Sequence, residues 1–293
     1  MPRIISESDE LLVVDKPAGL IVHSDGRTEE TSVADWILQD YPALKDVGEP
    51  WISPQGEKIV LPGIVHRLDR TTSGVMLIAK TNEMYRYLKR EFKARRIEKT
   101  YLAWVYGHMQ EREGIIIAEI IRTSGAPKQW TVKPTTGDNG RAPSEEVWST
   151  TTGLSAAVRT YKRAAVTKWK VLKETKDEQS GEPISLLEIK PLTGRTHQIR
   201  VHLSSIGHPI IADHLYAPDR APLLNFQRPA LHAYTISFSL GGERKTFLAP
   251  PPADFYYSSV LQNTRIKYDE MIKNAQKYPV DKFKGKSAKY NQL

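Results

Sequence analysis

The chain contains no cysteine, which excludes disulfides, thiolate metal sites and cysteine nucleophiles and is typical of proteins from a reducing compartment. No apolar run approaches the roughly 18 residues that a membrane-spanning helix requires. The longest candidate, 114–121, has eight residues and includes Glu119. The first ten residues are polar and acidic, so we expect no secretory signal there. Together these absences predict a cytoplasmic protein that does not enter a membrane.

Acidic residues are fewer than basic ones, since 34 Asp and Glu stand against 42 Lys and Arg and leave a net charge of +8. Such an excess predicts a polyanionic partner, and RNA, DNA and an anionic membrane surface all qualify at this stage. The membrane surface has weak support, because the basic stretch 262–293 contains no Trp and few Leu. Neither G-x-G-x-x-G nor G-x-x-x-x-G-K-[ST] occurs, so dinucleotide-binding and P-loop functions lack support.

Runs with β propensity outnumber helical runs, and many follow one another directly along the chain. We expect strands at 11–15, 75–79, 98–107, 166–172, 184–189, 231–240 and 245–248. We expect helices at 32–38, 82–93 and 196–206, capped by Ser32 or Thr31, by Asn82 and by Thr196 respectively. This order favours an α+β fold with a mixed, largely antiparallel sheet and flanking helices over a doubly wound parallel sheet.

The domain organisation expected from the sequence is one domain and a tail. Residues 1–261 form the domain, and 122–163 within it is an irregular excursion that could hold a hairpin. Residues 262–293 are rich in Lys and poor in aliphatic residues, which predicts a helix followed by a disordered end. Because ten residues precede the first expected strand, we expect no separate N-terminal RNA-binding module.

The most informative run is HRLDRTTSGVMLIAK, residues 66–80. Its single carboxylate, Asp69, lies between Arg67 and Arg70 and is followed by a Thr-Thr-Ser-Gly turn and an apolar strand. Cationic neighbours favour the ionised form of a carboxylate, which suits a nucleophile better than a proton donor. We expect Arg70 to contact the substrate. The alternative for Asp69 is a structural role in the turn.

A second run, GRTHQIRVHL at 194–203, contains a candidate partner for this carboxylate. Arg200 flanks the apolar stripe of the predicted helix and does not face open water. A guanidinium in that position needs an anion, because burying it unpaired is expensive. Asp69 is the obvious candidate, and such a pair would keep the carboxylate charged and aimed.

Two histidines of the same run, His197 and His202, are five residues apart, which is poor spacing for one metal ion on a helix. We therefore expect no metal at this site. Arg195 and His197 are expected to make hydrogen bonds or contacts with RNA. Lys16 could face either the pocket or the solvent.

With these runs identified, the chain resembles the RluA-like pseudouridine synthases, whose signature H-R-L-D-x-x-T-S-G is present at 66–74. Further stretches agree in the expected order: DKPAGLIVH (15–23), KTYLAWVYG (99–107), TGRTHQIRVHL (193–203), GHPIIADHLY (207–216) and LHAYTISF (231–238). The resemblance covers roughly residues 9–255. One departure is Ala212, where the family usually has Gly before the Asp; we expect its methyl group to affect a turn and not the chemistry.

The resemblance implies the pseudouridine synthase fold, with a central RNA-binding cleft, and an isomerase that converts a specific uridine of folded RNA to pseudouridine without metal or cofactor. Asp69 matches the catalytic aspartate, and Tyr101 matches the tyrosine that stacks on the target uracil. Arg200 matches the arginine that pairs with the aspartate. Arg67 matches the arginine that can fill the gap in the RNA, and Leu231 matches an apolar residue of the pocket wall.

These residue types suit the chemistry that the resemblance implies. Turning a uridine out of structured RNA costs a few kcal/mol, and stacking on an aromatic ring returns roughly 1–3 kcal/mol. An ionised carboxylate could attack the sugar at C1′, stabilise an oxocarbenium-like state or promote a glycal, and the residues leave these routes open. The implied substrate is large-subunit ribosomal RNA, transfer RNA or both, bound by a monomer.

Two other functions fit the residues less well. A noncatalytic RNA-binding protein on the same scaffold would have one of Asp69, Tyr101 and Arg200 replaced, and none is. A phosphotransferase with Asp69 as acceptor commonly has a second acid two residues later, where this chain has Thr71.

Overall fold

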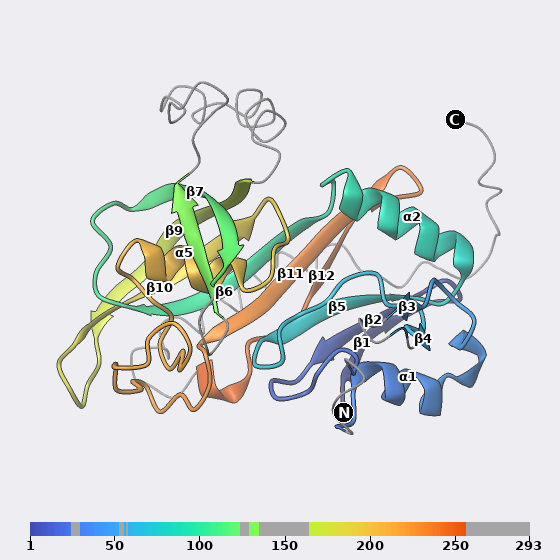
Figure 1. Ribbon diagram of the computed structural model, residues 1–293, viewed down its shortest axis with the longest axis horizontal. Helices are drawn as coiled ribbons and strands as arrows, with labels where there is room; N and C mark the ends of the chain where they lie inside the picture. The colour runs from blue at the N-terminus through green and yellow to red at the C-terminus, as the bar shows by residue number, and fades with distance from the viewer. Residues whose placement is uncertain (25–29, 53–55, 57, 124–128, 135–163, 256–293) are drawn as a thin grey trace.

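The computed structural model describes residues 1–24, 30–52, 56, 58–123, 129–134 and 164–255. Ten strands form one sheet in the order β1-β2-β5-β11-β6-β10-β9-β7-β8, with β12 paired to β11 (Figure 1). The strands are β1 (Arg3–Glu7), β2 (Leu11–Lys16), β5 (Ser73–Ala79), β6 (Glu98–Tyr106), β7 (Glu113–Arg122), β8 (Trp130–Pro134), β9 (Ala164–Lys176), β10 (Pro183–Pro191), β11 (Leu231–Leu240) and β12 (Glu243–Leu248). The pair of β5 and β11 is parallel, and the other neighbours in this sheet are antiparallel.

The remaining elements are short. The helices are α1 (Val33–Asp40), α2 (Asn82–Lys93) and α5 (Gln198–Ser205), the 3₁₀ turns are η1 (Pro42–Leu44) and η2 (Ala253–Phe255), and β3 (Trp51–Ile52) and β4 (Lys58–Ile59) form a separate pair. No helix among the described residues is both long enough and apolar enough to span a bilayer. The predicted α+β fold with a mixed, largely antiparallel sheet is confirmed.

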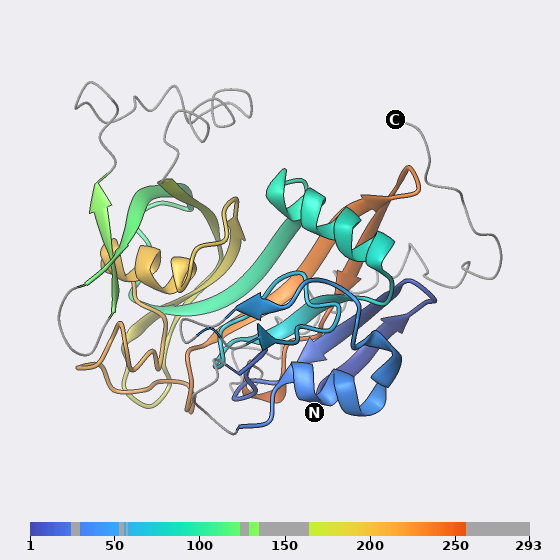
Figure 2. The ribbon, with the colours of Figure 1, turned by 45° about the vertical axis from the view of Figure 1, so that its right-hand side comes forward.

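Two hydrophobic cores lie on either side of the middle of the sheet. The first joins β2 and β5 to α1 and α2, and the second joins β6 and β10 to α5 and the segment 210–230. Strand β11 contributes Ile236 to the first core and Tyr234 to the second. Figure 2 shows β6 and β11 running between the half with α1 and α2 and the half with α5. Side chains at the start of β6 therefore lie where the two halves meet.

The start of β5 is pressed against β11, and one glycine of the strand makes this possible. Gly74 has φ 123°, and a β-carbon there would lie 2.1 Å from the carbonyl oxygen of Ala233. Only glycine tolerates both the conformation and the approach. Every residue of β5 is buried, so the strand is held from both faces and gives the preceding loop a rigid end. This loop carries Asp69.

The predicted helices are present, but two of the predicted caps are wrong. Ser32 caps α1 as predicted, in a reciprocal arrangement with Asp35. Helix α2 is capped by Thr81, whose hydroxyl accepts the backbone N–H of Met84 at 3.1 Å. Asn82, the predicted cap, lies one residue inside the helix.

Helix α5 begins at Gln198 and not at Thr196, because the loop before it folds back over the helix. The Gln198 side-chain oxygen accepts the Thr193 hydroxyl at 2.7 Å and the Arg195 backbone N–H at 3.0 Å. The N-cap position is His197, which has φ 54° and makes no side-chain cap. Gly207, with φ 83°, ends the helix as predicted. Of the apolar stripe expected on this helix, Ile199 and Leu203 are buried as predicted, but Ile206 is 39% exposed, and burial is not confined to a stripe because Gln198 to Leu203 are all buried.

Five of the strands, β1, β3, β4, β7 and β8, were not predicted. Strand β1 pairs with β2 at one edge of the sheet, although its sequence is largely polar. The apolar run 114–121 lies within β7, which pairs with β8 as an antiparallel hairpin. The second strand of this hairpin lies within the predicted excursion 122–163, of which 124–128 and 135–163 are outside the described residues. The predicted tail, 262–293, is also outside them.

Candidate active site

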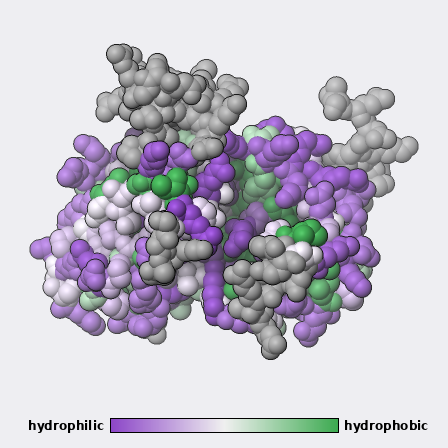
Figure 3. Space-filling view, viewed as in Figure 1, coloured by the Kyte–Doolittle hydropathy of each residue, from purple (hydrophilic) through white to green (hydrophobic). Residues whose placement is uncertain are grey.

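A cavity of about 870 Å³ lies where the two halves meet. Figure 3 shows the surface hollowed between the halves. Its wall is formed by the loop 65–69 before β5, the end of α2, the start of β6, the segment 191–200 and Leu231. Of the candidate residues, those lining the cavity are Asp69, Tyr101, Arg200, Arg67, Arg195, His197 and Leu231. Among the described lining residues, Asp69 is the sole carboxylate.

The loop that carries Asp69 is held in place by Lys16, the last residue of β2. The Lys16 ammonium donates to the carbonyl oxygens of Pro17 and Leu20, each at 2.8 Å, and of Arg70 at 3.2 Å. The side chain is fully buried, so both sequence expectations for it, the pocket and the solvent, are wrong. Burial lowers the pKa of Lys16 to about 7, although the nearby charge of Asp69 acts in the opposite direction. Lys16 thus ties the loop to β2.

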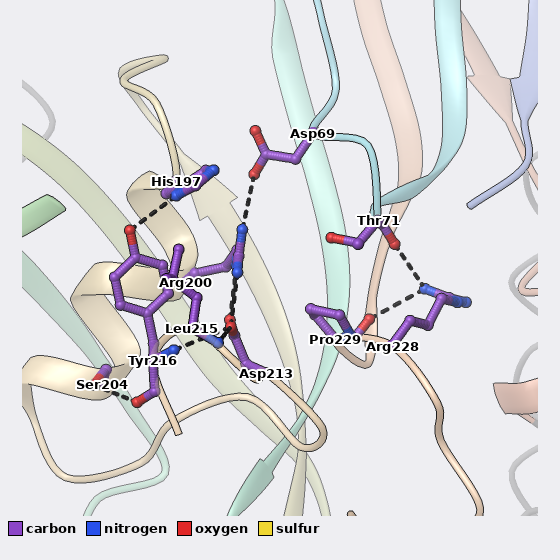
Figure 4. Close-up of polar contacts among 10 residues, drawn as sticks. All are labelled: Asp69, Thr71, His197, Arg200, Ser204, Asp213, Leu215, Tyr216, Arg228 and Pro229. Atoms are coloured by element: carbon purple, nitrogen blue, oxygen red, sulfur yellow. Dashed lines mark hydrogen bonds and ion pairs between the residues drawn. The ribbon is translucent and has the colours of Figure 1, made fainter. Parts of the chain in front are cut away.

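Arg200 has two carboxylate neighbours (Figure 4). Its Nε and Nη2 donate to the two oxygens of Asp213, each at 2.7 Å, and both side chains are buried. Its Nη1 lies 3.9 Å from Asp69 Oδ2. Arg200 therefore lies beside Asp69 as predicted, but the carboxylate that accepts hydrogen bonds from Arg200 is that of Asp213. Burial by itself would lower the pKa of Arg200, and the hydrogen bonds and charge of Asp213 raise it.

Asp213 was not predicted, although the rule that a buried guanidinium needs a carboxylate could have found it in the stretch 207–216. Its Oδ1 also accepts the backbone N–H groups of Leu215 and Tyr216, each at 3.2 Å. The preceding Ala212 has φ 57°, in the left-handed region that favours glycine. The turn at 212–216 therefore directs a fully buried carboxylate at Arg200.

Tyr101 is on β6, paired with Ala233 of β11 and Ile189 of β10, and contacts both hydrophobic cores. Burial, and secondarily the charge of Asp69, raise the pKa of its phenol, which stays neutral at physiological pH. The ring and the Asp69 carboxylate line the same cavity.

His197 and Tyr216 form a further polar contact beside Arg200. The His197 Nδ1 and the Tyr216 hydroxyl are 2.8 Å apart, and the Arg200 guanidinium lies 4.9 Å from the centre of the Tyr216 ring. Figure 4 shows His197 between Tyr216 and Asp69. Burial lowers the pKa of His197, and the charge of Asp69 acts against that shift. Tyr216 was also not predicted, because no motif or spacing in the neighbouring sequence indicates that it belongs to the site.

Arg70 is not among the described residues that line the cavity. Its Nη2 forms an ion pair with Glu30 at 3.0 Å, and its Nε donates to the carbonyl of Gly19 at 3.2 Å. These contacts hold the outside of the loop, so its position gives no support to the predicted contact with substrate. Arg67 is exposed at the cavity, and Leu231 is 2% exposed in its wall.

The described residues contain no group of three or more His, Cys, Asp and Glu side chains able to hold a metal ion. What the cavity offers is one carboxylate, a guanidinium fixed by a second carboxylate, a neutral phenol and several cations. This set can hold an anionic substrate, stack a flat ring and stabilise or attack an electron-poor carbon. A phosphotransferase would need a second acid at the cavity, and none lines its described part.

Comparison with known proteins agrees with this geometry. Residues 10–205 match the family described as RNA pseudouridylate synthase. The chain is 32% identical over 265 residues to an uncharacterized RNA pseudouridine synthase of Synechocystis sp., covering 90% of this chain and 69% of that protein. It is 33% identical over 256 residues to the dual-specificity RNA pseudouridine synthase RluA of Escherichia coli, covering 86% of this chain and 93% of that protein.

Among solved structures, the chain is similar to human RNA pseudouridylate synthase domain containing 4. The TM-score is 0.61 at 25% sequence identity, and the match covers 89% of this chain and 92% of the human chain. The likeness therefore extends over both halves of the sheet.

Proposed function

The chain belongs to the RNA pseudouridylate synthase family and is an isomerase, and from that premise we propose that Asp69 is its nucleophile and that its substrate is a specific uridine of large-subunit ribosomal RNA, transfer RNA or both. The name of the Escherichia coli relative includes dual specificity, which supports keeping more than one RNA substrate in the proposal. The reaction needs no external reactant. The bond between N1 and C1′ breaks, a bond between C5 and C1′ forms, C5 loses a proton and N1 gains one.

The observation that carries the proposal is the single carboxylate of the described cavity wall with a guanidinium aimed at it. Arg200 Nη1 lies 3.9 Å from Asp69, while the other edge of the guanidinium is occupied by Asp213. A nearby fixed cation attracts the carboxylate oxygens and holds them in position, and a nucleophile must be held in position to attack. Asp69 then attacks C1′, or its charge stabilises an oxocarbenium-like or glycal-forming path.

The residues around Asp69 supply the rest of the proposed mechanism. Tyr101 stacks on the everted uracil and recovers part of the cost of flipping, about 1–3 kcal/mol. Arg67, exposed at the cavity, occupies the space that the uridine leaves in the RNA. Leu231 closes the wall, and Arg195 and His197 contact the RNA from the loop before α5.

The test is Asp69→Asn, which keeps the size of the side chain and removes its charge. We expect tritium release from RNA labelled at uracil C5 to fall by at least about 10³-fold, as for loss of a nucleophile, with RNA affinity within a few-fold of the unaltered protein. Asp40→Asn, at an exposed position outside the cavity wall, is the matched control and should leave the rate unchanged. Substantial turnover by Asp69→Asn would refute the nucleophile assignment.

The substrate is identified by a separate experiment. Carbodiimide-based sequencing of pseudouridines in cells with and without the gene should show the loss of a mark in ribosomal or transfer RNA. A lost mark in another class of RNA, or no lost mark, would contradict the proposed substrate without bearing on Asp69.

A further inference from the structure

Three cations from three different segments meet in the cavity that holds Asp69: Arg95, Lys99 and Arg195. Arg95 follows the C-cap of α2, Lys99 is on β6, and Arg195 is in the loop before α5. A β-carbon placed on Gly194 would lie 3.8 Å from Lys99 Nζ, so the ammonium lies beside the loop that carries Arg195. Arg95 and Arg195 are close enough for the charge of Arg195 to contribute to the lowered pKa of Arg95, after burial.

None of these three side chains has an ion pair or hydrogen bond with a carboxylate in the described part of the chain. Burial lowers the pKa of Lys99 to about 8, and no described acid offsets that cost. Asp69, the carboxylate on the same wall, is engaged by Arg200. Arg95 and Arg195 are exposed and solvated, whereas Lys99 is half-buried. Among the described residues, folding therefore gathers three like charges around a half-buried ammonium without a counter-ion, and an anionic ligand would relieve both the repulsion and the burial of that charge.

The neighbouring Arg96 differs from Arg95, because it has a carboxylate partner and lies outside the cavity wall. Arg96 donates twice to Glu91, at 2.8 Å from Nε and at 2.5 Å from Nη2, and does not line the cavity. Arg95 instead has φ 60°, at the position after a helix C-cap where glycine is usual. A strained backbone at this position indicates that the location of the Arg95 side chain matters.

We propose that Arg95, Lys99 and Arg195 form a subsite for a backbone phosphate of the RNA that flanks the target uridine. The inference rests on the proposed function, since it assumes an RNA in the cavity. A phosphodiester carries one negative charge and unesterified oxygens that accept hydrogen bonds. Two guanidinium groups can donate to them in fork geometry while the ammonium, deeper in the wall, supplies a compact charge. The bound phosphate would set the direction of the strand past Asp69.

The experiment measures binding and not turnover, so it is independent of the Asp69 assignment. The probe is a fluorescent 20-nucleotide single-stranded RNA of mixed sequence, titrated at several KCl concentrations against Arg95→Gln, Lys99→Met, Arg195→Gln and the triple variant. Arg86→Gln is the matched control, because Arg86 is an arginine of α2, the helix that Arg95 follows, pairs with Glu83 and does not line the cavity. The titrations are repeated in the Asp69→Asn background.

We expect the triple variant to bind about tenfold or more weakly. Its dependence of log affinity on log salt should be shallower by about 0.7 for each phosphate that the protein no longer neutralises. Arg86→Gln should stay within twofold. Lys99→Met should unfold at the same or a higher temperature, because it removes an uncompensated charge, whereas a residue that only holds the fold would lower it.

Wild-type affinity and salt dependence in the triple variant would overturn the proposal, as would an equal effect of Arg86→Gln. Loss of affinity accompanied by a lowered unfolding temperature in every single variant would also overturn it. A protein that binds as expected but forms no pseudouridine would contradict the proposed function and leave this subsite supported.

Discussion

Arg200 illustrates how one buried side chain can have two acidic neighbours with different roles. Asp213 occupies the Nε and Nη2 edge of the guanidinium at 2.7 Å, and Asp69 lies 3.9 Å from the remaining Nη1. The short, bidentate pair fixes the orientation of the group, because two parallel hydrogen bonds leave it no rotation. The longer contact leaves Asp69 free to act on a ligand. Asp213 therefore fixes the orientation of the Arg200 guanidinium beside Asp69.

We predict that Asp213→Asn destabilises the protein by about 3 kcal/mol, since it leaves a buried guanidinium without its charge partner. The rate of pseudouridine formation should fall even at low temperature, where the variant is still folded, because Arg200 no longer points at Asp69. Urea unfolding and tritium release measure the two effects.

Asp254→Asn is the control for this prediction. Asp254 makes the same bidentate contact with Arg228, at 2.8 and 2.9 Å, but the Asp254 side chain is 35% exposed. Asp254→Asn should therefore lower the free energy of unfolding by less than Asp213→Asn does. An unchanged rate in folded Asp213→Asn would rule out the positioning role.

At the scale of elements, α2 is held at its start by two adjacent polar residues with different roles. Thr81 caps the helix by accepting the Met84 N–H at 3.1 Å. Asn82 instead binds the loop before β3, accepting the Gly48 N–H at 2.9 Å and donating to the Asp46 carbonyl at 3.3 Å. The helix ends at the proposed phosphate subsite, so its anchoring bears on RNA binding as well as stability.

We predict that Thr81→Ala lowers the free energy of unfolding by about 1 kcal/mol, the usual cost of losing an N-cap, and that Thr81→Ser restores most of it. Chemical denaturation of both variants measures this. A neutral Thr81→Ala would mean that the start of α2 is stabilised by the Asn82 contacts alone, and Asn82→Ala would then show the larger loss in the free energy of unfolding.

At the scale of the whole molecule, two fully buried histidines connect elements that are distant in sequence. His232 on β11 accepts from the Ser73 hydroxyl and donates to the Ala249 carbonyl, each at 2.9 Å. His202 on α5 contacts the Thr167 hydroxyl at 2.9 Å. Burial lowers the pKa of each to about 4, so both are neutral in the folded protein.

A third histidine behaves in the same way at the cavity wall. His66 accepts the Leu77 backbone N–H at 2.9 Å, which requires a neutral ring. Burial lowers its pKa to about 3, and the charge of Lys99 adds to that shift. Three histidines therefore lack a proton in the folded protein that they bind when the chain unfolds in mild acid.

This predicts a loss of stability in mild acid. The folded-state pKa values lie below the unfolded value of about 6.5, so below that pH the unfolded chain binds more protons and folding becomes less favourable. The contribution of each neutral histidine to the free energy of unfolding is fully present above about pH 6.5 and declines toward pH 4. At pH 5 the loss is roughly 2 kcal/mol per histidine.

Urea unfolding between pH 7.5 and 5 measures this loss. His202→Asn, which removes one of the histidines with a lowered pKa, should make the slope of stability against pH shallower, whatever its absolute stability. A flat profile between pH 7.5 and 5 would contradict the neutral state of these histidines.

Much of the fold and of the site could be predicted from the sequence because the signals are local. Alternation over 98–107 and the apolar runs at 75–79 and 231–240 mark β6, β5 and β11 without any tertiary information. The candidate residues Asp69, Tyr101 and Arg200 came from short motifs, and all three line one cavity. Strand β1 lacked such a signal, because its exposed edge position permits polar residues.

Only the tertiary structure decided which groups the charged side chains pair with. Asp213 is 13 residues from Arg200 and far from Asp69 in sequence, and no pattern indicates which carboxylate takes the hydrogen bonds. Arg70 faces Glu30 and Lys16 is fully buried, although both stand next to motif residues. Propensity and motif spacing act within a few residues, whereas the partner of a charged group depends on which surfaces the packing of the two halves brings together.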